Sequence, residues 1–263
     1  MIHQEINGIR YYSFEALTRH EEIVNAVFTR LGGVSLPPFA ELNVGHLVGD
    51  ELAAVETNQR LIYQTLGLSS HEVVTARQVH GNNVAMVGPN DGGKVIPATD
   101  ALITGTPGVN LMLRFADCLP IFLYDPETRA VGLGHAGWRG TAAKLAQRMT
   151  AMMVKGLGSD PTEIIAGLGP AIGPCCYQIG AEVAESLRAT LEDWETALHH
   201  LEADSVYLDL WEANRQQLVE VGVREIQTSN VCTACHTSEF FSHRAESGTT
   251  GRFAAMIGIR SSR

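Results

Sequence analysis

Short apolar runs, many of them rich in β-branched residues, recur along the whole chain and constrain its fold more than any other feature. Runs of this kind, bounded by turn-forming residues, predict strands. We predict strands over Ile23–Thr29, Val73–Val79, Asn83–Val87, Ala101–Thr104, Val109–Phe115, Leu119–Tyr124, Ala130–His135, Ile164–Leu168, Glu225–Ser229 and Phe253–Ile259. These are many strands for one sheet, which favours two sheets packed against each other.

Helical patterns separate some of these runs. They cover Asp50–Leu66, Thr141–Leu157, Ala181–Leu191 and Leu210–Val221. Pro126 follows Asp125 between two strand-like runs, which predicts that Leu119–Tyr124 and Ala130–His135 pair as a hairpin. We therefore predict an α+β fold of mixed sheets flanked by helices. No repeat or charged linker divides the chain, so we expect one domain over residues 1–263.

Composition and charge exclude several classes of protein. The chain has 45% hydrophobic and 18% charged residues, as ordinary globular proteins do. Its net charge of −10, without a Lys/Arg-rich run, argues against nucleic acid or an anionic membrane as a partner. Residues 1–8 have no cationic or apolar signal region, so we expect a cytoplasmic location. The uncharged stretch Ile164–Ala181 contains glycines and prolines that predict turns, not a membrane span.

The five cysteines are an odd number in a chain without an export signal, which disfavours a disulfide framework. Cys232-Thr-Ala-Cys235-His236 matches the C-x-x-C-H haem pattern, but covalent haem attachment belongs to exported proteins. The pair favours a structural turn with free thiols, with redox chemistry or weak metal binding as alternatives. Cys175 and Cys176 are adjacent, so we expect their side chains to diverge and not to share one metal.

Gly132-Leu-Gly134-His135-Ala-Gly137 matches the G-x-G-x-x-G pattern of dinucleotide-binding turns. The predicted hairpin makes the preceding strand antiparallel to its neighbour, unlike the parallel unit that such turns need. No acidic residue ends a following strand at the expected distance. We therefore expect the glycines to permit a tight bend that leaves His135 exposed.

His80, Cys118 and His135 each lie where a predicted strand gives way to a bend marked by glycine or proline. Strand ends of this kind commonly converge on one site. Two imidazoles and a thiolate would suit zinc, with a fourth position left for water or substrate, and copper is a further candidate. A metal-free nucleophile pair of Cys118 and His135 is an alternative, as are unrelated core or surface residues.

Several ordered motifs resemble those of the YfiH-type family, also called laccase-domain or multicopper polyphenol oxidase-like proteins. The resemblance covers nearly the whole chain, through residues 29–35, 42–45, 78–81, 99–101, 116–120, 135–140, 168–174, 241–244 and 250–252. It implies an α-β-β-α layered fold. It also implies that His80, Cys118 and His135 are a His-Cys-His metal triad, usually holding zinc.

The resemblance further implies a function. The family is associated with phosphorolysis of adenosine, inosine and methylthioadenosine, and with adenosine deamination. A copper-dependent polyphenol oxidase activity and the editing of peptidoglycan precursors by a hydrolase are alternatives. The chain contains no His-x-His sequence, which disfavours a multi-copper oxidase as the main function. Zinc, in contrast, lowers the pKa of bound water to about 7 and so suits deamination.

Two further residues are candidates for substrate binding. Arg139 follows His135 closely and begins a predicted helix, where it could hold phosphate or pair with Asp117 or Asp100. Asn43, in a polar turn, could contact substrate hydroxyls or cap the turn. The resemblance, taken with these residues, therefore implies a zinc-dependent purine nucleoside phosphorylase with deaminase capacity, acting on nucleoside and phosphate.

Overall fold

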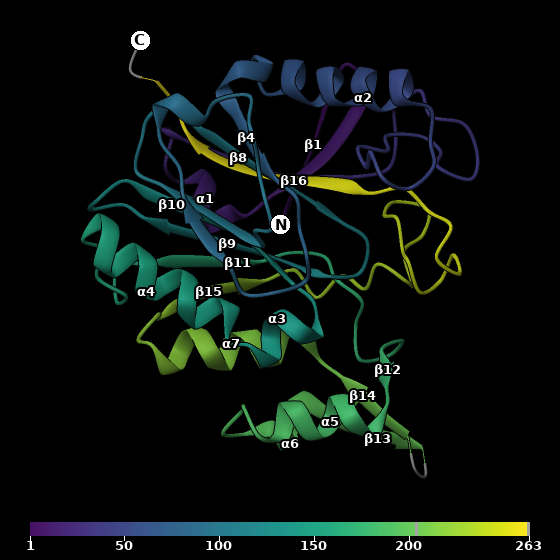
Figure 1. The fold of residues 1–263 in the computed structure, drawn as a ribbon, viewed down its shortest axis with the longest axis vertical. Helices are drawn as coiled ribbons and strands as arrows, with labels where there is room; N and C mark the ends of the chain where they lie inside the picture. Colours follow the sequence, from purple (N-terminus) through teal and green to yellow (C-terminus); the bar gives the residue numbers. More distant parts are fainter. Residues whose placement is uncertain (203–204, 262–263) are drawn as a thin grey trace.

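Two sheets lie face to face with helices on their outer sides in the computed structural model, which describes residues 1–202 and 205–261 (Figure 1). Helix α2 covers one sheet, and α4 and α7 lie over the other. A smaller sheet with α5 and α6 lies beyond α3 and α7. The predicted α+β layered arrangement of mixed sheets is confirmed.

The sheets combine strands from distant parts of the sequence. The first runs in the order β1 (Ile2–Ile6), β2 (Ile9–Ser13), β3 (Ile23–Phe28), β16 (Phe253–Ile259), β8 (Asn110–Phe115), β4 (Val73–Ala76) and β6 (Val95–Ile96). The second runs β15 (Glu225–Thr228), β11 (Ile165–Leu168), β9 (Leu119–Asp125), β10 (Ala130–Ala136), β7 (Ala101–Thr104) and β5 (Val84–Met86). The smaller one runs β12 (Gln178–Ile179), β14 (Ser205–Leu208) and β13 (Leu198–Glu202). The predicted β9–β10 hairpin is present, with antiparallel pairing.

Helices fill the connections between the strands. Their bounds are α1 Glu15–Thr18, α2 Leu52–Thr65, α3 Trp138–Ala142, α4 Leu145–Leu157, α5 Ala181–Arg188, α6 Trp194–Ala197 and α7 Leu210–Glu220. In the described part of the chain, none of them has the length and apolar character that crossing a membrane requires. The expected cytoplasmic location stays a prediction.

The central strands bury both of their faces, which explains why they are almost continuously apolar. Along β8, Leu111 and Leu113 face the core between the two sheets, whereas Met112 faces the core under α2. Along β9, Phe122 faces the core between the sheets and Ile121 faces the core under α4 and α7. This alternation is the two-residue period of a strand, so each sheet contributes to two cores.

The sequence analysis missed the N-terminal hairpin of β1 and β2. Ile6 pairs with Ile9 across a two-residue loop of Asn7 and Gly8, and both loop residues have positive φ, 53° and 81°. Asn-Gly is the preferred pair for such a turn. The exposed residues of β1 hid this strand, because a mostly polar edge strand lacks an apolar run.

The helix predicted over Thr141–Leu157 is present from Leu145 to Leu157 as α4, but it begins later than predicted, because Thr141 and Ala142 belong to the separate helix α3. Lys144 interrupts the two helices with a left-handed φ of 58°. Asn82 donates a side-chain hydrogen bond to the carbonyl of Ala143, and Gln217 donates one to the carbonyl of Thr141. These tertiary hydrogen bonds satisfy carbonyls that a continuous helix would use itself.

The core between the sheets yields a stability prediction. Leu113→Ala should lower the free energy of unfolding by about 2–5 kcal/mol, because it removes a fully buried side chain from a packed interior. Urea denaturation measures the change. Leu36→Ala is the matched control, since Leu36 is 77% exposed and its truncation should change stability by less than about 0.5 kcal/mol. Equal effects of the two substitutions would contradict the assigned core.

Candidate active site

His80, Cys118 and His135 converge as the sequence predicts. One nitrogen or sulfur atom from each lies within 4.8 Å of the others. His80 lies between β4 and β5, and Cys118 lies between β8 and β9, so both are at points where the chain passes from the first sheet to the second. His135 lies near the end of β10. The passages between the sheets therefore bring His80 and Cys118 to His135, which β10 supplies.

The buried carboxylate of Asp100 orients both histidines. It accepts hydrogen bonds from the backbone N–H groups of His80 (2.9 Å) and Gly81 (2.7 Å), and it lies 3.1 Å from Nδ1 of His135. His80 has a positive φ of 59°, a conformation that these backbone bonds hold in place. A carboxylate behind a histidine is the usual support of a metal ligand, because it fixes the ring and its tautomer.

Cys118 and His135 shift each other's protonation. Burial alone would raise the pKa of the Cys118 thiol, but the charge and hydrogen bonds of His135 and His80 lower it to about 6. Burial alone would lower the pKa of His135, but the Cys118 thiolate and Asp100 raise it to about 9. The pair therefore favours a thiolate beside an imidazolium, and the thiolate is the form that binds metals and attacks carbon.

Two glycines allow close approach around the cluster. A Cβ atom on Gly137 would lie 2.9 Å from Sγ of Cys118, so any other residue at this position would clash with the sulfur. Gly134 lies inside β10, where a side chain would collide with Met149 of α4. The expected bend that exposes His135 is wrong: His135 is only 4% exposed, because α4 packs directly on the glycines of a regular strand.

A cavity of about 730 Å³ opens onto the cluster. Its lining combines the aromatic side chains of Trp138 and Tyr177 with the arginines Arg77, Arg114, Arg139, Arg244 and Arg252. In the described part of the chain, none of these arginines forms an ion pair. The cavity is therefore cationic although the whole chain carries a net charge of −10, and this charge suits an anionic ligand.

The two predicted substrate-binding residues differ in position. The guanidinium of Arg139 lies 4.4 Å from the ring centre of Trp138 at the cavity wall, and within the described residues it pairs with neither Asp100 nor Asp117. Asn43 is buried, and its oxygen accepts a hydrogen bond from the backbone N–H of Arg252 (2.8 Å). Asn43 thus supports a residue of the cavity wall, and its contact with substrate stays a prediction.

Asp117 is a structural centre of the site that sequence reasoning did not select. It has a positive φ of 84°, and its carboxylate accepts hydrogen bonds from the hydroxyls of Thr233 and Ser242 (both 2.7 Å) and from the N–H of Arg244. These bonds tie the Cys118 loop to two distant segments of the chain. The only sequence signal was an acidic residue beside the candidate cysteine.

The other four cysteines also form a cluster. The Sγ atoms of Cys175, Cys176, Cys232 and Cys235 all lie within 4.8 Å of one another. The sequence analysis treated the two pairs separately, because Cys175 and Cys176 lie far from Cys232 and Cys235 along the chain. The expectation that the adjacent cysteines diverge is wrong, because both sulfurs approach Cys235, at 3.6 Å and 3.4 Å. Both clusters have donor sets that suit a metal.

Comparison with known proteins gives consistent relatives across almost the whole chain. Residues 24–260 match the family model described as "Multi-copper polyphenol oxidoreductase laccase". "Purine nucleoside phosphorylase YlmD" of Geobacillus stearothermophilus is 42% identical, with 90% of each chain covered. "Purine nucleoside phosphorylase YfiH" of Escherichia coli is 36% identical, with 88% of this chain and 91% of the relative covered.

Solved structures agree with these relatives. The crystal structure of YlmD from Geobacillus stearothermophilus superposes with a TM-score of 0.93 at 39% identity, covering 98% of both chains. That of the Bacillus licheniformis hypothetical protein YfiH has a TM-score of 0.92 at 35% identity, covering 98% of this chain and 99% of the other.

The lowered pKa of Cys118 yields a pH prediction for protein freed of metal with a chelator. Alkylation of Cys118 by iodoacetamide, followed by peptide mass spectrometry, should rise with pH around a midpoint of about 6. Below this pH the thiol is protonated and unreactive, and above it the thiolate reacts. His135→Asn should move the midpoint upward. A midpoint near 8.5 in the folded protein, the usual value for a free cysteine, would contradict the inferred pairing of a Cys118 thiolate with a His135 imidazolium.

The position of Asp100 behind His135 predicts a loss of metal affinity in Asp100→Asn. Zinc should protect Cys118 from alkylation in the unchanged protein, and half-protection of the variant should need about 10–100-fold more zinc. Asp125→Asn is the matched control: Asp125 is also buried, and its carboxylate accepts from Thr128 at the β9–β10 turn, away from the cluster. Equal zinc requirements in both variants would contradict the role of Asp100.

Proposed function

Because this chain belongs to the multi-copper polyphenol oxidoreductase laccase family, we propose that it is a purine nucleoside phosphorylase that cleaves adenosine, inosine and methylthioadenosine with phosphate. The observation that carries the proposal is its likeness, over nine-tenths of both chains, to a relative of that name. The cationic cavity beside the three-residue cluster supports it, because phosphate is an anion.

His80, Cys118 and His135 have the donor chemistry for zinc. Nδ1 of His135 faces Asp100, which leaves the other ring nitrogen for the cluster, and the lowered pKa supplies a thiolate. A bound zinc would supply a Lewis acid at the cavity wall. His80 is exposed, so one side of the cluster faces open space that a substrate can reach.

The cavity wall has groups for both substrates. Phosphorolysis joins a phosphate oxygen to C1′ of the ribose while the bond from C1′ to the purine nitrogen breaks and its electrons pass to the base. Arg139 and Arg244 carry planar donor groups that hold phosphate at two points. Trp138 and Tyr177 offer flat apolar faces to a purine ring. The arginines thus orient the nucleophile, and the aromatic rings hold the leaving group.

Adenosine deamination is a second candidate activity of the same cavity. The specific observation in its favour is the open side of the His-Cys-His cluster, since three protein ligands with a free position are typical of hydrolytic zinc sites. Copper at the same residues, with oxidation of phenols as a side activity, is a lesser alternative because one cluster holds one ion.

The experiment that tests the proposed function incubates the purified zinc-loaded protein with adenosine or inosine, with and without phosphate. Liquid chromatography with mass spectrometry identifies the products. We expect free base and ribose 1-phosphate only when phosphate is present, and inosine from adenosine without phosphate if deamination occurs. Base release that does not depend on phosphate, or no product at all, would overturn the proposal.

Arg139→Ala separates phosphate binding from metal binding. The variant should keep its zinc but raise the KM for phosphate about 10–100-fold, since a hydrogen bond to a charged group contributes about 1.5–3 kcal/mol. Arg148→Ala is the control, because Arg148 is exposed on α4 and outside the cavity. Cys118→Ala should lose both zinc and turnover. An unchanged KM for phosphate in Arg139→Ala would return this arginine to a structural role.

A further inference from the structure

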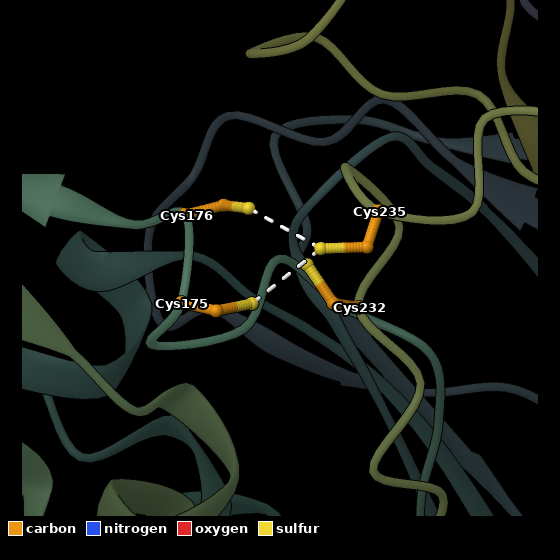
Figure 2. Close-up of side chains that lie close together, drawn as sticks. All are labelled: Cys175, Cys176, Cys232 and Cys235. Atoms are coloured by element: carbon orange, nitrogen blue, oxygen red, sulfur yellow. Dashed lines mark hydrogen bonds between the residues drawn. The ribbon is translucent and has the colours of Figure 1, made fainter.

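We propose that Cys175, Cys176, Cys232 and Cys235 bind a second zinc ion, which holds two loops together beside the active site. Figure 2 shows the four side chains arriving from two segments of the chain, with their sulfur atoms pointing toward one centre. All four sulfurs lie within 4.8 Å of one another. The cluster is separate from His80, Cys118 and His135, and the inference does not depend on the proposed enzymatic activity.

Backbone pairing brings the two segments together independently of the cysteines. Ala171 and Cys232 form an isolated parallel β-bridge, and the N–H of Thr233 donates to the carbonyl of Ala171 (3.0 Å). The N–H of Gly173 also points at Sγ of Cys232, 3.2 Å away. Hydrogen bonds from backbone N–H groups stabilise a thiolate, the form of cysteine that binds a metal.

A tight turn explains how two adjacent cysteines face one centre. The N–H groups of Cys176 and Tyr177 both donate to the carbonyl of Gly173 (2.9 Å each), so the chain coils around these residues. In a strand, neighbouring side chains point to opposite faces, whereas in a coiled turn they diverge much less. Cys232 and Cys235 occupy a similar turn, in which the N–H of Cys235 donates to the carbonyl of Cys232 (3.2 Å).

The spacing of the sulfurs fits one tetrahedral ion. With zinc–sulfur bonds of about 2.3 Å, the sulfurs of a tetrahedral site lie about 3.8 Å apart. The distances from Cys235 to Cys175 and Cys176 are 3.6 Å and 3.4 Å, too long for disulfide bonds. A disulfide would involve only two of the four sulfurs. Four cysteines around one ion, with no position left open, are typical of a structural zinc site.

A zinc ion at this cluster would stabilise one wall of the catalytic cavity. Tyr177, which lines the cavity, directly follows Cys176. Thr233, which directly follows Cys232, donates its hydroxyl to Asp117, the neighbour of Cys118. The four-cysteine cluster therefore links the cavity wall at Tyr177 to the loop that carries Cys118. Zinc binding would release the thiol protons and fix both loops in place.

Zinc stoichiometry tests the proposal. Protein is produced with added zinc, purified under reducing conditions and analysed by inductively coupled plasma mass spectrometry. We expect about two zinc ions per chain in the unchanged protein, because the structure offers two donor clusters. Cys175→Ser/Cys235→Ser should retain about one, since two ligands are lost. Cys118→Ser, the matched control at the other cluster, should also retain about one.

X-ray absorption at the zinc edge identifies the ligands in Cys118→Ser, and it decides the case even if the double variant fails to fold. We expect four sulfur neighbours at about 2.3 Å. Nitrogen or oxygen neighbours, iron in place of zinc, or no metal together with a disulfide in the untreated protein would each overturn the proposal. Two zinc ions retained by the folded double variant would also overturn it.

Discussion

The carboxylate of Asp100 is the constraint on which the candidate active site depends. It is fully buried, and a buried charge is costly unless hydrogen bonds satisfy it. Backbone N–H groups around His80 and the ring of His135 provide that compensation. The same bonds fix the turn after β4 against the end of β10. A negative charge behind His135 also raises the pKa of that histidine, which in turn keeps the Cys118 thiolate stable.

The fold positions these residues because the chain passes repeatedly from one sheet to the other. β4 and β8 belong to the first sheet, and the strands that follow them, β5 and β9, belong to the second. The residues in each passage lie at one end of the core between the sheets, which Phe115 and Phe122 help to fill. A rigid, close-packed interior thus holds His80 and Cys118 in register, although they are far apart in the sequence.

The sequence predicted what depends on local pattern and on family resemblance. Strands buried on both faces, such as β9, are nearly continuous apolar runs and were recognisable, whereas the mostly polar edge strand β1 was not. The break at Lys144 depends on side chains donated from other segments, and no local pattern encodes these. The partnership of Cys175 with Cys235 likewise depends on a bridge between distant segments. Spacing along the chain alone could not reveal it.

The distribution of charge makes the candidate site suited to an anionic ligand. The chain is acidic overall, so negative charge at its surface repels phosphate at long range, and salt screens this repulsion within about 10 Å at 0.1 M. Inside the cavity positive charge predominates, because five arginines line it and none of them forms an ion pair within residues 1–202 and 205–261. Arg114 and Arg252 are partly buried, and burial lowers the pKa of both, so an anion that entered the cavity would offset the cost of burying these charges. Binding of an anion and stability of the cavity wall are therefore coupled.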